Sequence, residues 1–261
     1  MLLEAVRRAV IDRSPLADGA VTRSTVGDRL VFVAVDAAET ASAGVAHRPP
    51  GDQWADPTDI PAVDVGAWAT DPDGERTRLE RAIGVATLNA LSAPLIDWRR
   101  GDPFEALAAD VDAIATVGLF GPAFRKFGAV DVRVIERRDV DPPDPPEGVS
   151  VSLYAPDEVE HAFAGADVVF VTGSTLLYGG TERYLEAARA VPDVVLVGAT
   201  ASFVPEAVFD AGATMLAGAQ VTDPAAVRAG ALAGKCGTDL HDAGLAKVYV
   251  TAGGSTGLTI D

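Results

Sequence analysis

The sequence has one cysteine, Cys236, and only three lysines among 261 residues. One thiol excludes an intrachain disulfide and any metal site built from paired cysteines. No apolar run approaches the length of a membrane-spanning helix. The first eight residues carry a glutamate and two arginines where a signal peptide has its apolar segment. We therefore expect a mature cytoplasmic protein with no membrane partner.

Basic residues are also few, because 21 Lys and Arg stand against 38 Asp and Glu, for a net charge of −17. Such a chain lacks the basic face that a duplex nucleic acid partner requires. Asp is about twice as frequent as Glu, and arginine supplies nearly all of the positive charge. This composition is typical of halophilic proteins, since molar salt shortens the Debye length to roughly 3 Å and screens like-charge repulsion. An acidic mesophilic enzyme is the alternative.

Hydrophobic residues make up 48% of the chain, enough to bury a full core. Over residues 1–100 the pattern predicts a small α+β domain. Its elements are a first helix ending at Ser14-Pro15, a hairpin that turns at Gly27-Asp28, a third strand and a helix, at residues 2–13, 21–25 with 30–35, 42–47 and 76–91. The segment 49–73 is rich in Pro, Asp and Gly and predicts a surface loop.

Residues 101–261 predict an α/β domain. A short amphipathic helix over 104–112 precedes buried apolar runs that end near residues 117, 135, 171 and 197. Alternating strands and helices imply a parallel open sheet. Ligands bind beyond the carboxyl ends of the strands in such sheets. The loops that follow these runs should therefore surround one crevice.

The first candidate site combines Gly118 and Gly121 with Glu136, at the ends of two successive strands. An acid in this position binds ribose hydroxyls in nucleotide folds. However, Gly-Leu-Phe-Gly-Pro departs from the G-x-G-x-x-G pattern, and Pro122 lacks an N–H for a pyrophosphate. A nucleotide- or S-adenosylmethionine-dependent transferase or oxidoreductase is one reading. A tight turn beside a solvated acid, or Glu136 acting on another ligand, are the others.

The second candidate is the Thr172-Gly173-Ser174-Thr175 turn, followed by Gly179-Gly180-Thr181. Consecutive N–H groups and hydroxyls after a buried strand can form an anion-binding concavity. Alternatively, Thr181 simply caps the next helix. Gly198 and Thr200 follow the next strand and should border the same crevice.

Asn89 lies on an apolar helix face, where a buried amide must find hydrogen-bond partners. It belongs either to a structural network or to the crevice wall. Cys236 and His241, with Asp239 and Asp242, form only a weak metal pattern, because Cys-x4-His is not a strong ligand spacing. No Ser-His-Asp order can be assigned, since Ser174 lacks a nucleophile-elbow sequence.

The motifs together resemble the putative heavy-metal chelation family of unknown function, over nearly the whole chain. The resemblance is most specific at residues 83–90, 117–122, 134–136, 167–175, 194–198 and 211–218. It implies an enolase N-terminal-like domain followed by a Rossmann-like domain, with the site in the cleft between them. It also implies that Glu136, Asn89 and the 172–181 loop are cleft residues. The chain departs from the family pattern at 178–181 and at Gly198-Ala199, where the family usually has Asn-Gly-Thr and Gly-Pro.

The first functional hypothesis is a protein that binds a small anionic ligand or metal chelate in an interdomain cleft. Glu136 would serve as ligand or general base, Asn89 as an orienting amide, and Thr172, Ser174 and Thr175 as anion donors. A divalent metal ion is a candidate cofactor, which oxygen ligands such as Glu136 would have to meet.

A third hypothesis, beside the nucleotide-dependent enzyme, is an interaction module. The 49–73 loop contains Trp54 and Trp68, which could anchor a partner or the second subunit of a homodimer.

Overall fold

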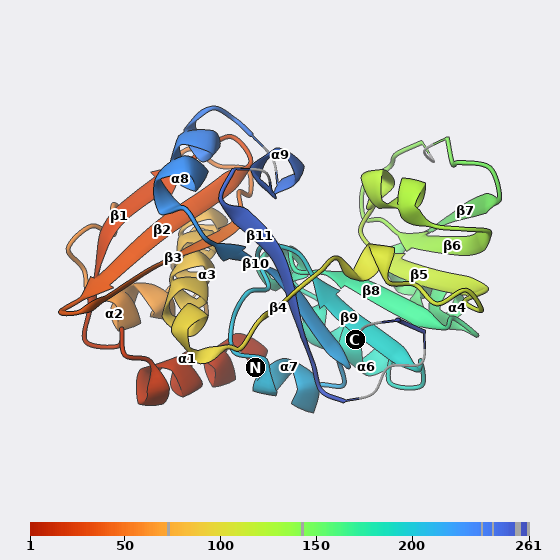
Figure 1. Ribbon diagram of the computed structural model, residues 1–261, viewed down its shortest axis with the longest axis horizontal. Helices are drawn as coiled ribbons and strands as arrows, with labels where there is room; N and C mark the ends of the chain where they lie inside the picture. The colour runs from red at the N-terminus through yellow and green to blue at the C-terminus, as the bar shows by residue number, and fades with distance from the viewer. Residues whose placement is uncertain (72–73, 142–143, 236, 242, 254–256, 260–261) are drawn as a thin grey trace.

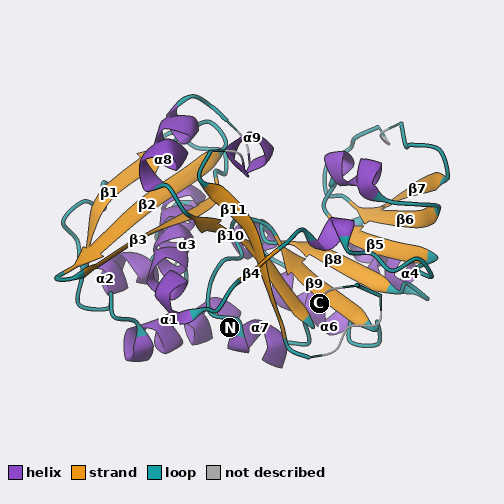
Figure 2. Ribbon diagram, in the orientation of Figure 1, coloured by secondary structure: helices purple, strands orange, loops and turns teal. Residues whose placement is uncertain are grey.

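Two sheets organise the chain (Figures 1 and 2). The computed structural model describes residues 1–71, 74–141, 144–235, 237–241, 243–253 and 257–259. One sheet is antiparallel, with three strands in the order β1-β2-β3, and the other has eight strands and is mostly parallel. The expected combination of a large parallel α/β sheet with a smaller α+β unit is confirmed.

The small sheet contains the predicted hairpin and third strand, as β1 (Ala20–Val26), β2 (Leu30–Ala37) and β3 (Thr40–His47). Helix α3 (Arg78–Ser92) packs on this sheet and begins with a capping box, in which Thr77 and Glu80 bond each other's backbone N–H groups. Gly44 of β3 permits the close contact, because a Cβ there would lie 2.1 Å from the carbonyl oxygen of Ala86. We call β1–β3 and α3 the small-sheet side, and the eight-stranded sheet with the loops and helices that directly follow its parallel strands the large-sheet side.

The N-terminal helix α1 (Leu2–Arg13) ends at Ser14, as the sequence predicts. The segment 49–73 was expected to be a loop throughout, and this is wrong for α2 (Ala62–Ala67). The apolar residues of α2 pack against α3, which favours a helix over a surface excursion. Trp68 is buried, so it is not a surface anchor, whereas Trp54 is 41% exposed.

The large sheet has the order β4-β11-β10-β9-β8-β5-β6-β7. Strands β5 to β10 run parallel, β11 pairs antiparallel with β10 at one edge, and β4 pairs antiparallel with β11. Their bounds are Arg99–Arg100 (β4), Ala113–Val117 (β5), Val130–Ile135 (β6), Val149–Tyr154 (β7), Val168–Thr172 (β8), Asp193–Val197 (β9), Met215–Val221 (β10) and Leu245–Thr251 (β11). β5 and β9 are buried at every position, which explains their continuous apolar runs.

Short helices connect these strands: α4 (Val159–Phe163), α5 (Thr175–Tyr178), α6 (Thr181–Ala187), α7 (Glu206–Asp210), α8 (Pro224–Leu232) and α9 (Gly237–His241). Between β5 and β6 there is only a 3-10 segment, η3 (Gly121–Lys126). The helix predicted over 104–112 is wrong. A 3-10 turn (Pro103–Glu105) forms instead, since Asp102 accepts the N–H of Phe104, and Leu107 then pairs with Leu258 as a β-bridge.

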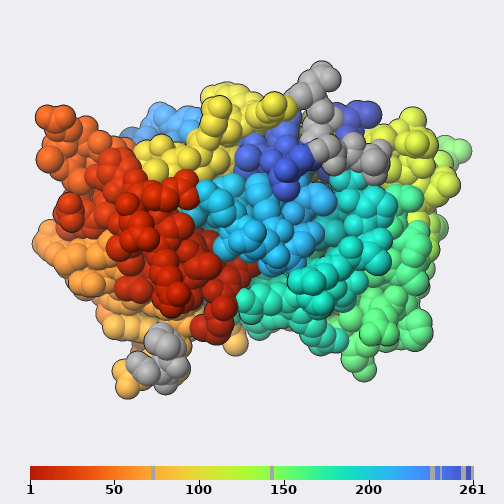
Figure 3. Space-filling view, turned by 90° about the horizontal axis from the view of Figure 1, so that it is seen from below, coloured from red at the N-terminus to blue at the C-terminus, as the bar shows by residue number. Residues whose placement is uncertain are grey.

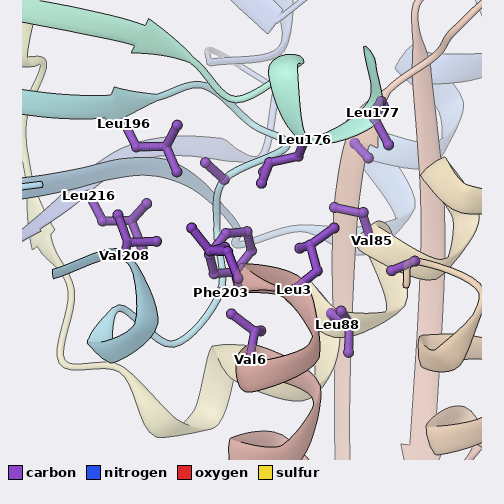
Figure 4. Packing of buried hydrophobic residues seen from close by; sticks show 14 of the residues in the cluster. Leu3, Val6, Val85, Leu88, Leu176, Leu177, Leu196, Phe203, Val208 and Leu216 are labelled. Atoms are coloured by element: carbon purple, nitrogen blue, oxygen red, sulfur yellow. The ribbon is translucent and has the colours of Figure 1, made fainter. Parts of the chain in front are cut away.

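One buried apolar cluster joins the two sides (Figure 4). Leu3 and Val6 of α1 and Leu88 of α3 belong to the same cluster as Leu196 of β9 and Phe203. Figure 3 shows the N-terminal residues lying directly against the segment that contains α7, in agreement with the packing of α1 on α7. Helix α8 likewise packs on β1 and β2. The two sheets therefore share a core, while the predicted boundary near residue 100 stays a prediction.

Candidate functional site

A cleft of about 1220 Å³ lies between the two sheets. Its floor is formed by the carboxyl ends of β5, β6, β8 and β9, and its opposite wall by the β1–β2 turn, the end of β3 and the end of α8. From β5 the chain continues to β6 on one side, and β8 lies on the other. The order of the strands thus reverses beneath the cleft, which is the usual position of a ligand site in open α/β sheets.

The cleft brings together eight of the thirteen residues that the sequence singled out. Those lining it are Gly118, Glu136, Thr172, Ser174, Thr175, Gly179, Gly198 and Thr200. Those not among its lining residues are Asn89, Gly121, Gly173, Gly180 and Thr181.

Backbone N–H groups at the strand ends are already bonded inside the protein. Gly118 donates to the carbonyl of Ile135 (2.8 Å), Gly173 to Val197 (2.7 Å) and Gly198 to Ala217 (2.9 Å). Gly118 and Gly198 have φ of 98° and 127°, which favours glycine at both. Because the N–H of Gly173 is already bonded to the neighbouring strand, the 172–175 turn does not offer a run of free backbone donors to an anion.

The hydroxyl groups of the same turn divide into two sets. Thr175 donates to the carbonyl of Thr172 (2.8 Å), and its oxygen lies 2.8 Å from the buried hydroxyl of Thr181. This pair holds α5 and α6 together, while the N-cap of α6 is Gly180. Thr172 and Ser174 are half-buried in the cleft, with their hydroxyl oxygens 3.2 Å apart. These two side chains are the hydroxyls available to a ligand.

Glu136 follows β6 with its side chain only 8% exposed. Its Oε1 accepts hydrogen bonds from the N–H groups of Arg137 (3.0 Å) and Arg138 (3.1 Å), and Nε of Arg138 lies at 3.4 Å. The carboxylate is therefore fixed by the loop that it begins.

Four arginines line the cleft, and the sequence reasoning missed all of them. Arg29 comes from the β1–β2 turn and Arg48 from the end of β3, whereas Arg137 and Arg138 follow β6. Arg138 pairs with Glu136, but Arg29, Arg48 and Arg137 make no ion pair within the described residues. Their position was the available signal in the sequence, since Arg48 directly follows β3, and Arg137 and Arg138 are the two residues after Glu136 at the end of β6.

Tyr178 connects the two walls. The guanidinium of Arg137 lies 3.6 Å from the centre of its ring, and that of Arg78, from α3, lies at 5.0 Å. The phenol oxygen lies 3.4 Å from Nε2 of His47. Loss of hydration in the cleft wall, followed by the charges of Arg137 and Arg138, lowers the pKa of His47 below its ordinary 6.5. Neither Tyr178 nor His47 was predicted as a site residue.

Asn89, the only asparagine of the chain, is buried at the junction of the two sides. Its Nδ2 donates to the carbonyls of Val45 (2.8 Å), Thr200 (3.2 Å) and Ala199 (3.3 Å), and its Oδ1 accepts the N–H of Ser202 (3.3 Å). This geometry fits the structural alternative, in which the amide ties α3 and β3 to the loop after β9.

A metal centre finds little support in the described residues, where no three His, Cys, Asp or Glu side chains gather. Cys236 and Asp242 of the weak C-terminal pattern lie outside those residues. His241 donates Nδ1–H to the carbonyl of Leu245 (3.0 Å), and burial is the main cause that lowers its pKa. In the same part of the chain, no helix is both long and apolar enough to cross a bilayer.

Comparison with known proteins relates the chain to one family. A family model, DUF364, described as "Putative heavy-metal chelation", matches residues 102–250. An uncharacterised protein of Methanocaldococcus jannaschii is 30% identical over 157 residues, which are 56% of this chain and 56% of that protein. The chain thus matches about half the length of this curated relative.

Two crystal structures of DUF364 proteins with unknown function share the fold. The protein from Pyrococcus horikoshii is 23% identical with a TM-score of 0.76, over 97% of this chain and all of that one. The protein from Desulfitobacterium hafniense is 20% identical with a TM-score of 0.71, over 95% and 98%.

Proposed function

The chain belongs to the DUF364 family, and we propose that it binds a small anionic ligand, including an anionic metal chelate, in the cleft between its two sheets. The observation that carries this proposal is the arginine content of the cleft. In a chain with a net charge of −17, four arginines border one cavity, and three of them have no ion-pair partner among the described residues. A cavity lined by one sign of charge concentrates ligands of the opposite sign.

The polar groups on the floor suit the same ligand. Thr172 and Ser174 present hydroxyls beside the arginines, and a hydroxyl can donate to a carboxylate or phosphate oxygen. The guanidinium fork matches both of these anions with two parallel hydrogen bonds. The arginines therefore attract the anion by their charge, and the hydroxyls orient it through directional hydrogen bonds.

A bare metal cation does not fit this site. The four guanidinium groups repel it, and Glu136 is the acid most firmly fixed in the cleft, with Oε1 already occupied by its own loop. A metal ion that enters this cleft is better explained as part of the ligand, bound within an anionic chelate whose organic groups contact the arginines. Within that proposal Glu136 orients the loop of Arg137 and Arg138, and its part as a base stays a prediction.

A nucleotide-dependent enzyme is the second candidate, favoured by one observation. The strand order of β5 to β10 reverses as in dinucleotide-binding sheets, and Glu136 ends the second strand, where an acid binds ribose hydroxyls. Against it, η3 replaces the long helix whose N-terminus would receive the pyrophosphate, and it starts at Gly121-Pro122. Thermal shift with NAD, NADP, ATP and S-adenosylmethionine separates the two candidates.

Isothermal titration calorimetry tests the main proposal, with citrate, fructose bisphosphate and inorganic phosphate as probes. We expect at least one of these anions to bind the wild type and to bind Arg137→Gln about tenfold more weakly, as expected for loss of a charge-assisted contact. Arg125→Gln is the matched control, because Arg125 is exposed, lies outside the cleft and makes the same change in charge. The proposal fails if none of the three anions binds, or if both variants behave alike.

A further inference from the structure

We infer that the ligand of this cleft carries at least two anionic groups and is held by arginines from both sheets at once. This inference rests on the proposed function and narrows it to a class of ligand, a polycarboxylate or a multiply phosphorylated small molecule. A single compact anion would be a poor occupant.

The arginines form two pairs that are fixed by different parts of the fold. Arg29 and Arg48 are neighbours, because the N–H of Arg48 donates to the carbonyl of Arg29 (3.0 Å) where β2 and β3 pair. Arg137 and Arg138 are held by their N–H groups on Glu136. One pair thus belongs to the small sheet and the other to the large sheet, and the cleft lies between them.

Charge balance favours more than one negative group. The four guanidinium groups outnumber the two carboxylates that line the cleft, those of Asp28 and Glu136. Glu136 is already paired with Arg138, so a single negative charge would leave further guanidinium charge uncompensated. His47 stands among these groups and becomes a further cation when it is protonated.

The volume of the cleft also favours a ligand with more than one anionic group. The cleft measures about 1220 Å³, whereas sites for drug-sized ligands fall in the range of about 300–1000 Å³. An acetate or a phosphate ion fills a small part of this space and reaches one arginine pair. A molecule with anionic groups at two ends can contact Arg29 or Arg48 with one end and Arg137 with the other. Since guanidinium binds carboxylate and phosphate in the same bidentate way, the geometry leaves that choice to experiment.

The experiment compares ligands of different valence on variants of both sides. Citrate and fructose bisphosphate serve as multivalent probes, and acetate and inorganic phosphate as compact ones, each titrated calorimetrically into the full chain. Arg29→Gln removes a charge from the small-sheet side and Arg137→Gln from the large-sheet side, and both side chains are exposed, so neither change disturbs the core. Arg23→Gln on β1 and Arg125→Gln on η3, also exposed and outside the cleft, are the matched controls.

We expect one multivalent probe to bind at least about tenfold more tightly than either compact ion. We also expect its affinity to fall by about tenfold in each cleft variant while the controls leave it unchanged. The stronger of citrate and fructose bisphosphate then identifies carboxylate or phosphate.

Two results would overturn the inference and leave the proposed function standing. One is equal affinity for compact and multivalent anions. The other is a loss of affinity that is confined to the variant of one side. Failure of all four anions to bind the wild type would instead overturn the proposed function itself.

Discussion

The hydroxyl of Tyr178 lies 3.4 Å from Nε2 of His47, and so the end of α5 on the large-sheet side touches the end of β3 on the small-sheet side. The two rings are 6.0 Å apart between centres and inclined by 52°. Both residues line the cleft. A ligand that changes the charge of His47 therefore acts on the contact between the two sides.

The first prediction concerns pH. Lost hydration, together with repulsion by Arg137 and Arg138, keeps the pKa of His47 below 6.5 in the free protein. A bound anion offsets this repulsion and raises the pKa, so binding takes up a proton. Affinity should be high below the pKa of the free protein and fall as pH rises through the pKa of the complex. His47→Gln should abolish this dependence.

The probe must keep a constant charge, and a short alkane disulfonate does so across the range of about pH 5 to 8 in which histidine titrates. Calorimetry in two buffers of different ionisation enthalpy measures the proton uptake directly. Equal binding enthalpies in both buffers, after correction for dilution, would contradict the prediction. The stability of the free protein should have the opposite dependence on pH. Because the pKa of His47 is lowered in the folded state, stability is lost as pH falls through 6.5 and below.

Tyr178 should position Arg137. Replacing it by Leu removes the ring on which the guanidinium lies at 3.6 Å, and a cation–π contact is worth about 0.5–2 kcal/mol. We expect Tyr178→Leu to weaken anion binding by about twofold to thirtyfold, the equivalent of that energy. Tyr178→Phe, which keeps the ring and loses the hydroxyl, is the control and should keep most of the affinity. Calorimetric titration of the same anion distinguishes them, and equal losses in both variants would assign the effect to the hydroxyl.

The position of the cleft was predictable from local sequence, because parallel strands are buried on both faces and appear as apolar runs. The ends of β5, β6, β8 and β9 follow from such runs, and their carboxyl ends must gather at one edge. The same reasoning predicted Thr172, Ser174 and Glu136 beside the cleft, which they line.

The arginines were not predictable by the same reasoning. Arg137 and Arg138 beside Glu136 have the appearance of solvated charges, and Arg29 lies more than 100 positions earlier in the chain. These arginines come close together only through the packing of the small sheet against the large one, which no local pattern specifies. Asn89 illustrates the same limit. Its burial followed from the apolar helix face, but whether its amide faced the cleft or bonded backbone groups of β3 and of the 199–202 loop was decided by packing.

Asn89 supplies the third prediction. Asn89→Ala removes an amide that bonds backbone groups of β3 and of the 199–202 loop. Leaving such buried groups unpaired costs about 1–3 kcal/mol each, and we expect a loss of about 2–4 kcal/mol overall. Chemical denaturation measures it. Thr87→Ala on the same helix is the control, because its hydroxyl bonds only Ile83 within α3.

Anion affinity of the folded Asn89→Ala protein separates a structural role from an orienting one. If Asn89 only links α3 to β3 and to the 199–202 loop, the folded variant keeps the wild-type affinity under conditions where it is fully native. A variant with unchanged stability and lost affinity would restore Asn89 to the ligand site.

Asp102 supplies the fourth prediction. Its side chain is 7% exposed and contacts the ammonium groups of both Lys126 and Lys247, two of the three lysines in the chain. Burial acts to raise the pKa of Asp102, but hydrogen bonds from the two lysines outweigh it and lower the pKa below 3.8. Stability from this cluster is therefore present above pH 3.8 and lost as pH falls through the folded-state pKa.

We expect Asp102→Asn to cost about 2 kcal/mol, less than the 3–5 kcal/mol of a fully buried pair. The discount reflects the lysines, whose side chains are 27% and 36% exposed. Urea denaturation at neutral pH measures the loss, with the exposed Asp110→Asn as the control. The difference between the two variants should shrink in acid. A difference that persists unchanged there would contradict an electrostatic origin.

The last prediction concerns salt, and it follows from a net charge of −17 on 261 residues. The chain carries 38 Asp and Glu against 21 Lys and Arg, so self-repulsion opposes the compact state. Raising KCl from about 0.1 M to about 1 M shortens the Debye length from about 10 Å to 3 Å. The free energy of unfolding, measured by urea titration, should rise over this range.

A matched pair of variants tests whether screening is the cause. Replacing exposed acids such as Asp110 and Glu186 by neutral amides should raise stability at low salt and change little at high salt, because the repulsion that they contribute is then already screened. Glu186 is paired with Arg189 at the surface, so its substitution should gain less than that of Asp110. Equal stability of the wild type at both salt concentrations would contradict the prediction and assign the acidic composition to solubility instead.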